Sequence, residues 1–169
     1  MSAVLREPRR LFEMTVDQLN AVLAIETAAY EFPWTHGNFI DSLAAGYPAR
    51  VLVDAQGTPL GYFVAMQGIE ELHLLNLTVA PSCQGQGHGR FMLDRLVELC
   101  RARGATRLWL EVRSGNAGAR GLYLRYGFRH VGQRRRYYPA AAGQREDAVV
   151  MSLDLAPVDA QLDRADALD

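Results

Sequence analysis

Apolar residues at helical spacing predict a first helix that ends at about Tyr30. Thr15 and Gln18 precede the apolar stripe at the spacing of a capping box, in which each side chain bonds to the other residue's backbone. The segment Phe32-Pro33-Trp34 should end this helix, because the residue before a proline disfavours helical backbone angles. A shorter helix is then expected near 36–45.

Short apolar runs bounded by glycine and proline predict the strands. The first two are expected at 50–54 and 60–66, joined by a turn at 56–59. A longer strand at about 71–80 leads directly into a glycine-rich loop. Three later strands complete the set, at 107–112, 128–137 and 147–155.

Two more helices are expected between these strands. One begins at about Gly87 or Gly89 and continues to Arg103, because an apolar stripe runs along it. The other covers 117–126 and ends at Gly127, a residue type common just after the last helical turn. Helices and strands thus alternate, and the pattern predicts a mixed α/β fold.

The organisation of the chain is simple. Its 169 residues suffice for one sizeable core, and they show no internal repeat and no linker. We expect one domain at 11–155, with an N-terminal extension at 1–10 and an acidic, flexible tail at 156–169.

Composition excludes several classes of function. A formal net charge of −1 gives no overall electrostatic case for a nucleic acid or an anionic membrane as partner. No apolar run approaches the roughly 20 residues of a membrane span, and the first residues lack a signal-peptide core, so we expect a cytoplasmic protein. Nothing bears on the oligomeric state, for which a monomer is the default.

The cysteine and lysine content excludes further kinds of site and reaction. Cys83 and Cys100 are far apart in sequence and suit neither a disulfide framework nor a zinc site, so no metal is expected. All 18 basic residues are arginine. The absence of lysine excludes Schiff-base catalysis and any phosphate-binding loop that depends on lysine.

The glycine-rich loop reads CQGQGHGRFML over 83–93. Successive backbone N–H groups before a helix can hold an anion, and glycine allows the positive φ angles that such turns use. The spacing fits neither a Walker loop nor the G-x-G-x-x-G dinucleotide fingerprint. A tight turn without any ligand is the alternative.

Two motifs carry a resemblance to a known family. The loop at 84–89, QGQGHG, resembles the Q/R-x-x-G-x-G/A motif of the GCN5-related N-acetyltransferase (GNAT) superfamily. The segment from Asn116 to Phe128 resembles that family's N-x-x-A-x-x-x-Y-x-x-x-G-F pattern. More narrowly, the FPW segment at 32–34, WLEVR at 109–113 and YYP at 137–139 resemble the ribosomal-protein-alanine N-acetyltransferases.

The resemblance covers roughly residues 12–153 and implies a fold and a cosubstrate. The fold would be a single GNAT-like α/β (α+β) domain, with a central mixed, mostly antiparallel sheet flanked by helices and the cofactor wedged between two splayed central strands. The cofactor would be acetyl-CoA, bound through its pyrophosphate by the loop, with no metal. The implied cofactor-binding residues are Leu77, Thr78, Val79, Gln84, Gly85, Gln86, Gly87, His88, Gly89, Arg90 and Asn116.

Glu111 is the candidate proton acceptor. An α-amine has a pKa near 7.7–8.0 and must lose a proton before it attacks a thioester. Glu111 lies in an apolar strand, so we expect desolvation to raise the pKa of its carboxyl. Strand alternation places it on the side of Trp109, and whether this side is buried or faces solvent stays open.

The resemblance assigns the other site residues. Tyr123 would donate a proton to the departing CoA sulfur, although core packing is an alternative for this side chain. Asn116 could equally be a helix N-cap. A peptide-binding groove would be lined by Phe32, Trp34, Tyr137 and Tyr138, with core packing as the alternative for the first two. The run at 134–136, RRR, is interpreted as solubilising, with a contact to ribosomal RNA or to the 3′-phosphate of CoA as the alternatives.

The resulting hypothesis is an enzyme that transfers acetyl from acetyl-CoA to a protein N-terminus, namely the N-terminal alanine of a small-subunit ribosomal protein. Direct contact with nucleic acid or membrane is not expected. Two alternatives stay open: an acetyltransferase that acts on a small-molecule amine or a lysine side chain, and a non-catalytic module that binds acyl-CoA.

Overall fold

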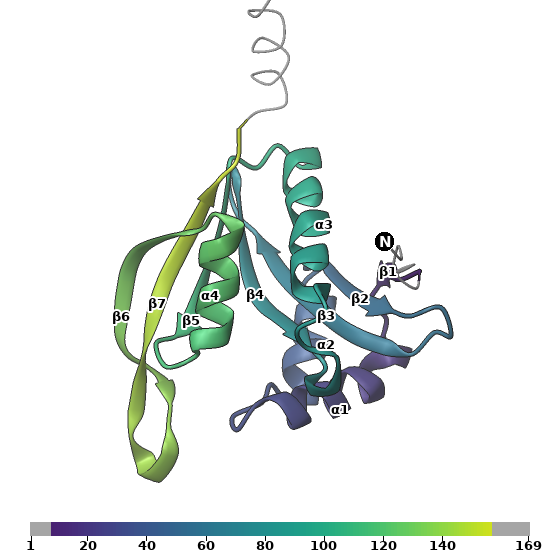
Figure 1. The fold of residues 1–169 in the computed structure, drawn as a ribbon, viewed down its shortest axis with the longest axis horizontal. Coiled ribbons are helices and arrows are strands. Elements are labelled where there is room, and N and C mark those ends of the chain that lie inside the picture. The colour runs from purple at the N-terminus through teal and green to yellow at the C-terminus, as the bar shows by residue number, and fades with distance from the viewer. Residues whose placement is uncertain (1–7, 157–169) are drawn as a thin grey trace, which may run out of the picture. The chain divides into compact units, whose positions relative to one another are not determined.

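The computed structural model describes residues 8–156 and contains one β-sheet with helices beside it (Figure 1). In chain order the elements are β1 (Arg10–Glu13), α1 (Leu19–Ala29), α2 (His36–Ala44), β2 (Ala49–Val53), β3 (Pro59–Gln67), β4 (Glu71–Val79), α3 (His88–Ala102), β5 (Arg107–Arg113), α4 (Ala117–Tyr126), β6 (Arg129–Pro139) and β7 (Arg145–Asp154). The sheet has seven strands in the order β1-β2-β3-β4-β5-β7-β6.

The sheet is mixed, as predicted. β4 and β5 are parallel, whereas β2 is antiparallel to β1 and β3, and β7 is antiparallel to β5 and β6. Every predicted helix and strand is present within a few residues of its expected bounds. Within residues 8–156, no helix is long and apolar enough to cross a bilayer.

Strand β1 was not predicted. Its sequence, RLFE, pairs antiparallel with β2, with Arg10 opposite Val53 and Glu13 opposite Arg50. Most of its side chains are exposed, so it lacks the alternation of buried and exposed positions that identifies a strand. Most of the predicted extension (1–7) and nearly all of the predicted tail (157–169) lie outside the described residues.

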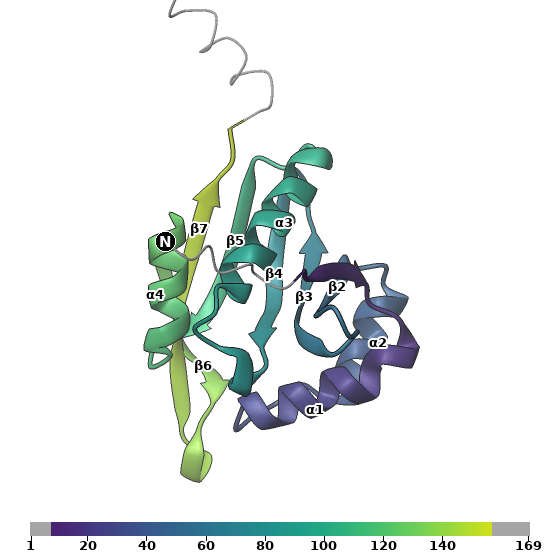
Figure 2. The same ribbon diagram turned by 45° about the vertical axis from the view of Figure 1, so that its right-hand side comes forward.

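The structure divides into two compact units, and the division passes through β3, β4 and α3. The first unit holds the described residues up to Val64 together with Asn76–Met92. In it, α1 and α2 lie beside β2 and β3 (Figures 1 and 2). The capping box of Thr15 and Gln18 is confirmed, but it opens a 3-10 turn that precedes α1.

The second unit holds Ala65–Leu75 and the described residues from Leu93 onward. Its β5 alternates strictly, with Leu108, Leu110 and Val112 buried on one face. Trp109 and Glu111 lie on the opposite face, as strand alternation predicts. β5 pairs with β7 along its whole length, from Arg107 to Arg113, which holds this second face in a defined register.

Candidate active site

Glu111 is the centre of a polar cluster in the second unit. Its Oε2 atom lies 3.2 Å from Nε2 of His73 and accepts a long hydrogen bond of 3.4 Å from the hydroxyl of Tyr137. Its Oε1 atom lies 3.1 Å from Nε of Arg134. The Glu111 side chain is 8% exposed, so the carboxylate is surrounded by these donors rather than by bulk water.

The register of the parallel strands places His73 in this cluster. His73 on β4 is the pairing partner of Trp109 on β5, and the two rings stack with centroids 3.7 Å apart and planes 8° from parallel. Glu111 follows Trp109 by two positions and therefore lies on the same face of the sheet. The stack limits how far the imidazole can turn, so its contact with Glu111 has a defined direction.

A bulge in β6 brings Arg134 and Tyr137 to the same carboxylate. Strand side chains alternate between faces, so residues three positions apart would ordinarily point to opposite sides. Here Arg134 pairs with Ala148 and Tyr138 with Glu146, so four steps along β6 match two along β7. The surplus residues form a bulge, which re-aims the side chains around it.

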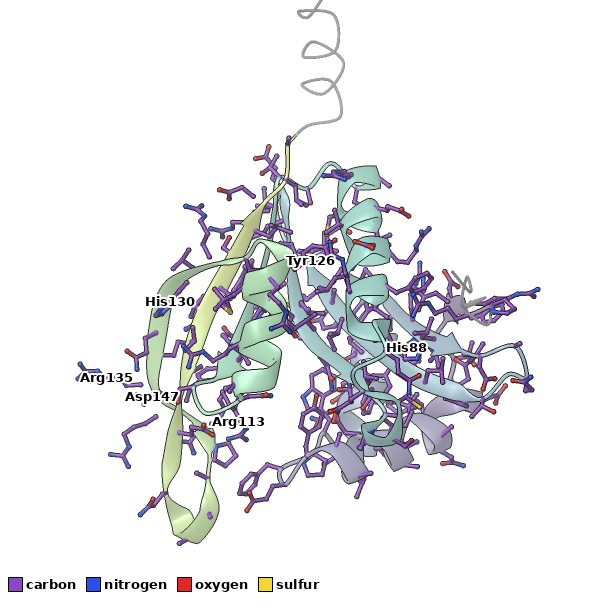
Figure 3. The ribbon with its side chains drawn as sticks, in the orientation of Figure 1. His88, Arg113, Tyr126, His130, Arg135 and Asp147 are labelled. Atoms are coloured by element: carbon purple, nitrogen blue, oxygen red, sulfur yellow. The ribbon has the colours of Figure 1, made fainter. Side chains whose placement is uncertain are left out.

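The bulge is held by hydrogen bonds to its backbone. Arg136 has φ of +52°, and its N–H donates to Oδ1 of Asp147 at 2.8 Å. The guanidinium of Arg145 donates to the carbonyls of Arg136 and Tyr137, at 2.8 and 2.7 Å. Asp147 lies beside the bulge, while Arg135 points away from it (Figure 3).

The expected rise in the pKa of Glu111 is wrong. Burial does raise the pKa of this carboxyl, but the contacts with His73, the charge of Arg134 and the hydroxyl of Tyr137 together outweigh it and lower the pKa. Desolvation was inferred from neighbours in sequence, whereas these donors come from other strands. Interpreting Arg134 only as a solubilising residue was also wrong, because it faces Glu111.

The other predicted catalytic residue, Tyr123, is a buried residue of α4. Its ring packs against Phe128 with centroids 5.4 Å apart. Asn116 is the N-cap of α4, since its side chain accepts from the N–H of Ala119. The structural alternatives that the sequence left open are therefore present for both residues, and their catalytic and cofactor-binding roles stay predictions.

The glycine loop lies in the first unit and opens α3. Gly85 and Gly87 have φ of +76° and +82°, angles that glycine adopts without strain. Among residues 8–156, a Cβ atom added at either position would meet nothing within 4 Å, so there is open space beside these two glycines. Together with the helix N-terminus at His88, this geometry fits the pyrophosphate of acetyl-CoA, an anion that backbone N–H groups can hold.

Neighbouring side chains support the loop. Gln84 donates to the carbonyl of Val79 at 3.3 Å, which ties the loop to the end of β4. His88 contacts the guanidinium of Arg9 at 2.8 Å, and that guanidinium also lies over the ring of Phe91. The predicted N-terminal extension therefore contributes a residue to the start of α3. The remaining predicted loop residues, Gln86, Gly89 and Arg90, lie in the same stretch of chain.

The end of β4 is anchored by a buried polar network. The described pairing of β4 with β5 ends at Leu74, so Leu77, Thr78 and Val79 lie beyond it. Thr78 is hydrogen-bonded to Tyr30 at 2.7 Å and to Asn76 at 2.7 Å. These contacts fix the strand from its buried face.

Asn76 in turn donates to Glu26 of α1, a residue only 1% exposed. Burial raises the pKa of Glu26, and the hydrogen bond from Asn76 only partly offsets this. Glu26 therefore links α1 to β4 through a carboxyl that keeps its proton to a higher pH than an exposed glutamate does.

The predicted substrate-binding aromatic residues differ in their surroundings. Trp34 packs on the core residue Phe39 with ring centroids 5.1 Å apart, whereas Phe32 is exposed. Tyr137 and Tyr138 contact one another edge to face at 4.9 Å. Burial raises the pKa values of both tyrosines, and the nearby charge of Glu111 adds to this. Both hydroxyls therefore stay protonated and can act as donors.

Sequence reasoning missed His73 as a member of the site. One signal was available, because His73 is a titratable residue within the apolar run of β4 and shares the side-chain alternation of Leu75 and Leu77. Its pairing with Trp109 depends on strand register, which the sequence does not specify. Among the described residues, no group of three or more His, Cys, Asp or Glu side chains is placed to hold a metal ion.

Comparison with known proteins shows which family this chain resembles. Residues 19–128 match the sequence pattern described as "Acetyltransferase (GNAT) family". The ribosomal protein bS18-alanine N-acetyltransferase of Haemophilus ducreyi is 36% identical over 86% of this chain and 100% of its own length. The protein of the same name from Escherichia coli K12 is 36% identical over 81% of this chain and 91% of its own.

Solved structures agree. The crystal structure of the ribosomal-protein-S18-alanine N-acetyltransferase from Escherichia coli has a TM-score of 0.81 and 34% identity, covering 88% of this chain and 95% of that one. The Ard1 structure from Thermoplasma volcanium, at 22% identity and a TM-score of 0.77, shares the fold.

Proposed function

The chain belongs to the acetyltransferase (GNAT) family, and from that premise we propose that it acetylates the N-terminal α-amine of a protein. The acceptor we propose is the N-terminal alanine of a small-subunit ribosomal protein of the bS18 type. Relatives that carry this activity in their names match most of the chain at 36% identity, which supports the choice of acceptor.

The observation that carries the proposal is the contact between Tyr137 and Glu111. Tyr137 belongs to the YYP segment, which we assign to the acceptor peptide, and Glu111 is the carboxylate that would receive the proton of the amine. A segment that binds the peptide would therefore adjoin the proton acceptor. Tyr138 would extend this contact, and the sequence resemblance assigns Phe32 and Trp34 to the peptide as well.

Acetyl-CoA would supply the activated acetyl group as a thioester. We assign its pyrophosphate to the backbone N–H groups of the loop at 84–89 and to Arg90 at the start of α3. Leu77, Thr78 and Val79 would offer backbone groups, and Asn116 its side chain. Tyr123 would deliver a proton to the sulfur as the thiolate leaves.

Transfer to defined acceptors tests the proposal. The purified protein would be incubated with acetyl-CoA and peptides that begin with the residues of bS18, and products would be identified by mass spectrometry. We expect one acetyl group on the N-terminal amine of peptides that begin with alanine. Robust transfer to polyamines or internal lysines, with none to these peptides, would refute the proposed acceptor.

The Tyr123→Phe variant tests the role of the leaving-group donor. Because the ring is retained, packing against Phe128 should survive, whereas the proton donor is lost. We expect kcat to fall by about 10²-fold or more with little change in the KM for acetyl-CoA. An acyl-CoA-binding module without catalysis would instead show cofactor binding and no turnover in any variant.

A further inference from the structure

We propose that His73 is a positioning residue for Glu111, which engages Oε2 and leaves an acceptor site on Oε1 for the incoming amine. This proposal rests on the proposed function, because it assumes that Glu111 receives the proton. It assigns a role to a side chain that belongs to none of the sequence motifs described above.

The geometry of the imidazole supports this role. Nε2 of His73 and Oε2 of Glu111 are 3.2 Å apart, and their side chains are 12% and 8% exposed. Two acceptors so close and so poorly solvated would repel each other, so one of them carries a proton. A carboxylate cannot donate, and therefore Nε2 is the protonated nitrogen when Glu111 is ionised. The stack on Trp109 fixes the plane from which this donor points.

The donors around Glu111 determine which acceptor sites of its carboxylate remain available to the amine. A carboxylate offers about four lone-pair sites, two on each oxygen. His73 and Tyr137 both contact Oε2, whereas Arg134 contacts Oε1. Among the described residues, one acceptor site on Oε1 is therefore left, and an amine N–H can use it. His73 provides the shorter of the two contacts that occupy Oε2, so removing it would free the carboxylate to rotate.

His73 also favours the ionised form of the carboxylate. Burial raises the pKa of Glu111, and the contacts with His73 lead the effects that lower it. Replacing His73 with a residue that cannot donate keeps the burial that raises the pKa of Glu111 and removes the leading effect that lowers it. The carboxylate would then take up a proton at a higher pH, and a protonated carboxyl cannot accept a proton from the amine.

The test compares His73→Phe with His73→Gln. Phenylalanine preserves the stack on Trp109 and removes the donor, whereas glutamine keeps an N–H near the position of Nε2. For His73→Phe we expect kcat to fall about tenfold at pH 8, with an unchanged KM for acetyl-CoA, because the carboxylate loses its fixed orientation. For His73→Gln we expect kcat within about threefold of the wild-type value.

The pH profile separates positioning from a merely structural role. The ratio of kcat/KM between variant and wild type cancels the titration of the peptide amine, which both enzymes share. In His73→Phe this ratio should fall steadily toward acid pH. Carbon-13 NMR of the Glu111 carboxyl should show the same change without turnover, as a titration at higher pH than in the wild type.

His130→Phe is the matched control, since His130 on β6 lies in the same unit and contacts the carbonyl of Gly132 rather than Glu111. It should behave as the wild type. Wild-type kcat in His73→Phe across the pH range, or an unmoved Glu111 titration, would overturn the proposal. Glu111→Gln, measured alongside, separates the proposed function from the proposed role of His73. Wild-type activity in Glu111→Gln would refute Glu111 as the proton acceptor. A large loss of activity in Glu111→Gln, together with an unaffected His73→Phe, would refute only the role of His73.

Discussion

Two glutamates with little-exposed side chains have pKa values that shift in opposite directions in this protein. Glu26 is 1% exposed and contacts the neutral amide of Asn76, and burial raises the pKa of its carboxyl. The Glu111 side chain is 8% exposed, and burial there is outweighed by His73 and Arg134, so the pKa is lowered. Both side chains are thus little exposed, whereas their pKa values shift in opposite directions.

The groups that donate to the two carboxyls differ in charge. A buried carboxylate stays ionised only when cationic or several neutral donors compensate for lost hydration. Glu111 meets an imidazole, a guanidinium and a hydroxyl, and we assign it to proton transfer. The effects that lower the pKa of Glu26 come from the neutral groups of Asn76, Tyr62 and Trp34, and this residue joins α1 to β4, which is a structural task.

The largest expected contrast is in activity. Glu111→Gln should lower kcat by at least about 10²-fold, because it removes the proton acceptor while keeping the shape of the side chain. Glu26→Gln, the same chemical change, should leave kcat within about threefold. Both would be measured with saturating acetyl-CoA and peptide. Comparable losses in the two variants would show that the glutamates do not differ in the way described.

Stability should show the reverse contrast. Glu26→Ala leaves the amide of Asn76 without its partner and creates a cavity, so we expect a loss of about 2–4 kcal/mol in the free energy of unfolding. Glu111→Ala should cost less, because solvent can reach Arg134, whose side chain is 49% exposed. Urea unfolding of both variants at neutral pH measures the difference. A larger loss in Glu111→Ala would contradict the assignment.

The two carboxyls should also give stability opposite dependences on pH. The raised pKa of Glu26 contributes stability that is present below the unfolded value and is lost as pH rises through the folded one. The lowered pKa of Glu111 contributes stability that is present above the unfolded value and is lost as pH falls through the folded one. Wild type should therefore lose stability relative to Glu26→Gln with rising pH, and relative to Glu111→Gln with falling pH. Thermal unfolding of the three proteins across pH checks both signs, and parallel curves would refute them.

The smallest expected effect concerns the network next to Glu26. Thr78→Val removes the hydroxyl that connects Tyr30 with Asn76 and keeps the side-chain shape. We expect a loss of about 1 kcal/mol in unfolding free energy. Thr58→Val, at an exposed position in the turn between β2 and β3, is the control and should change stability by less than about 0.5 kcal/mol.

The sequence predicted what depends on local patterns. Helices, strands, the capping box of Thr15 and the face of Glu111 all follow from spacing along the chain. It did not predict β1, whose pairing is supplied by β2, nor the contact of His73 with Glu111, which depends on the register of β4 against β5. It also gave the wrong direction for the pKa of Glu111, because the donors that decide it come from strands distant in sequence.

The β6 bulge makes the geometry of the site depend on the number of residues in this stretch of the strand. Surface hairpins usually tolerate insertions and deletions, because nothing depends on how many residues they contain. Between Arg134 and Tyr138 the number of residues decides which side chains meet Glu111. A single residue added or removed there would exchange inward and outward positions for the YYP segment while leaving every motif intact. Among related sequences, a constant length of this stretch would therefore be as informative as the identity of its residues.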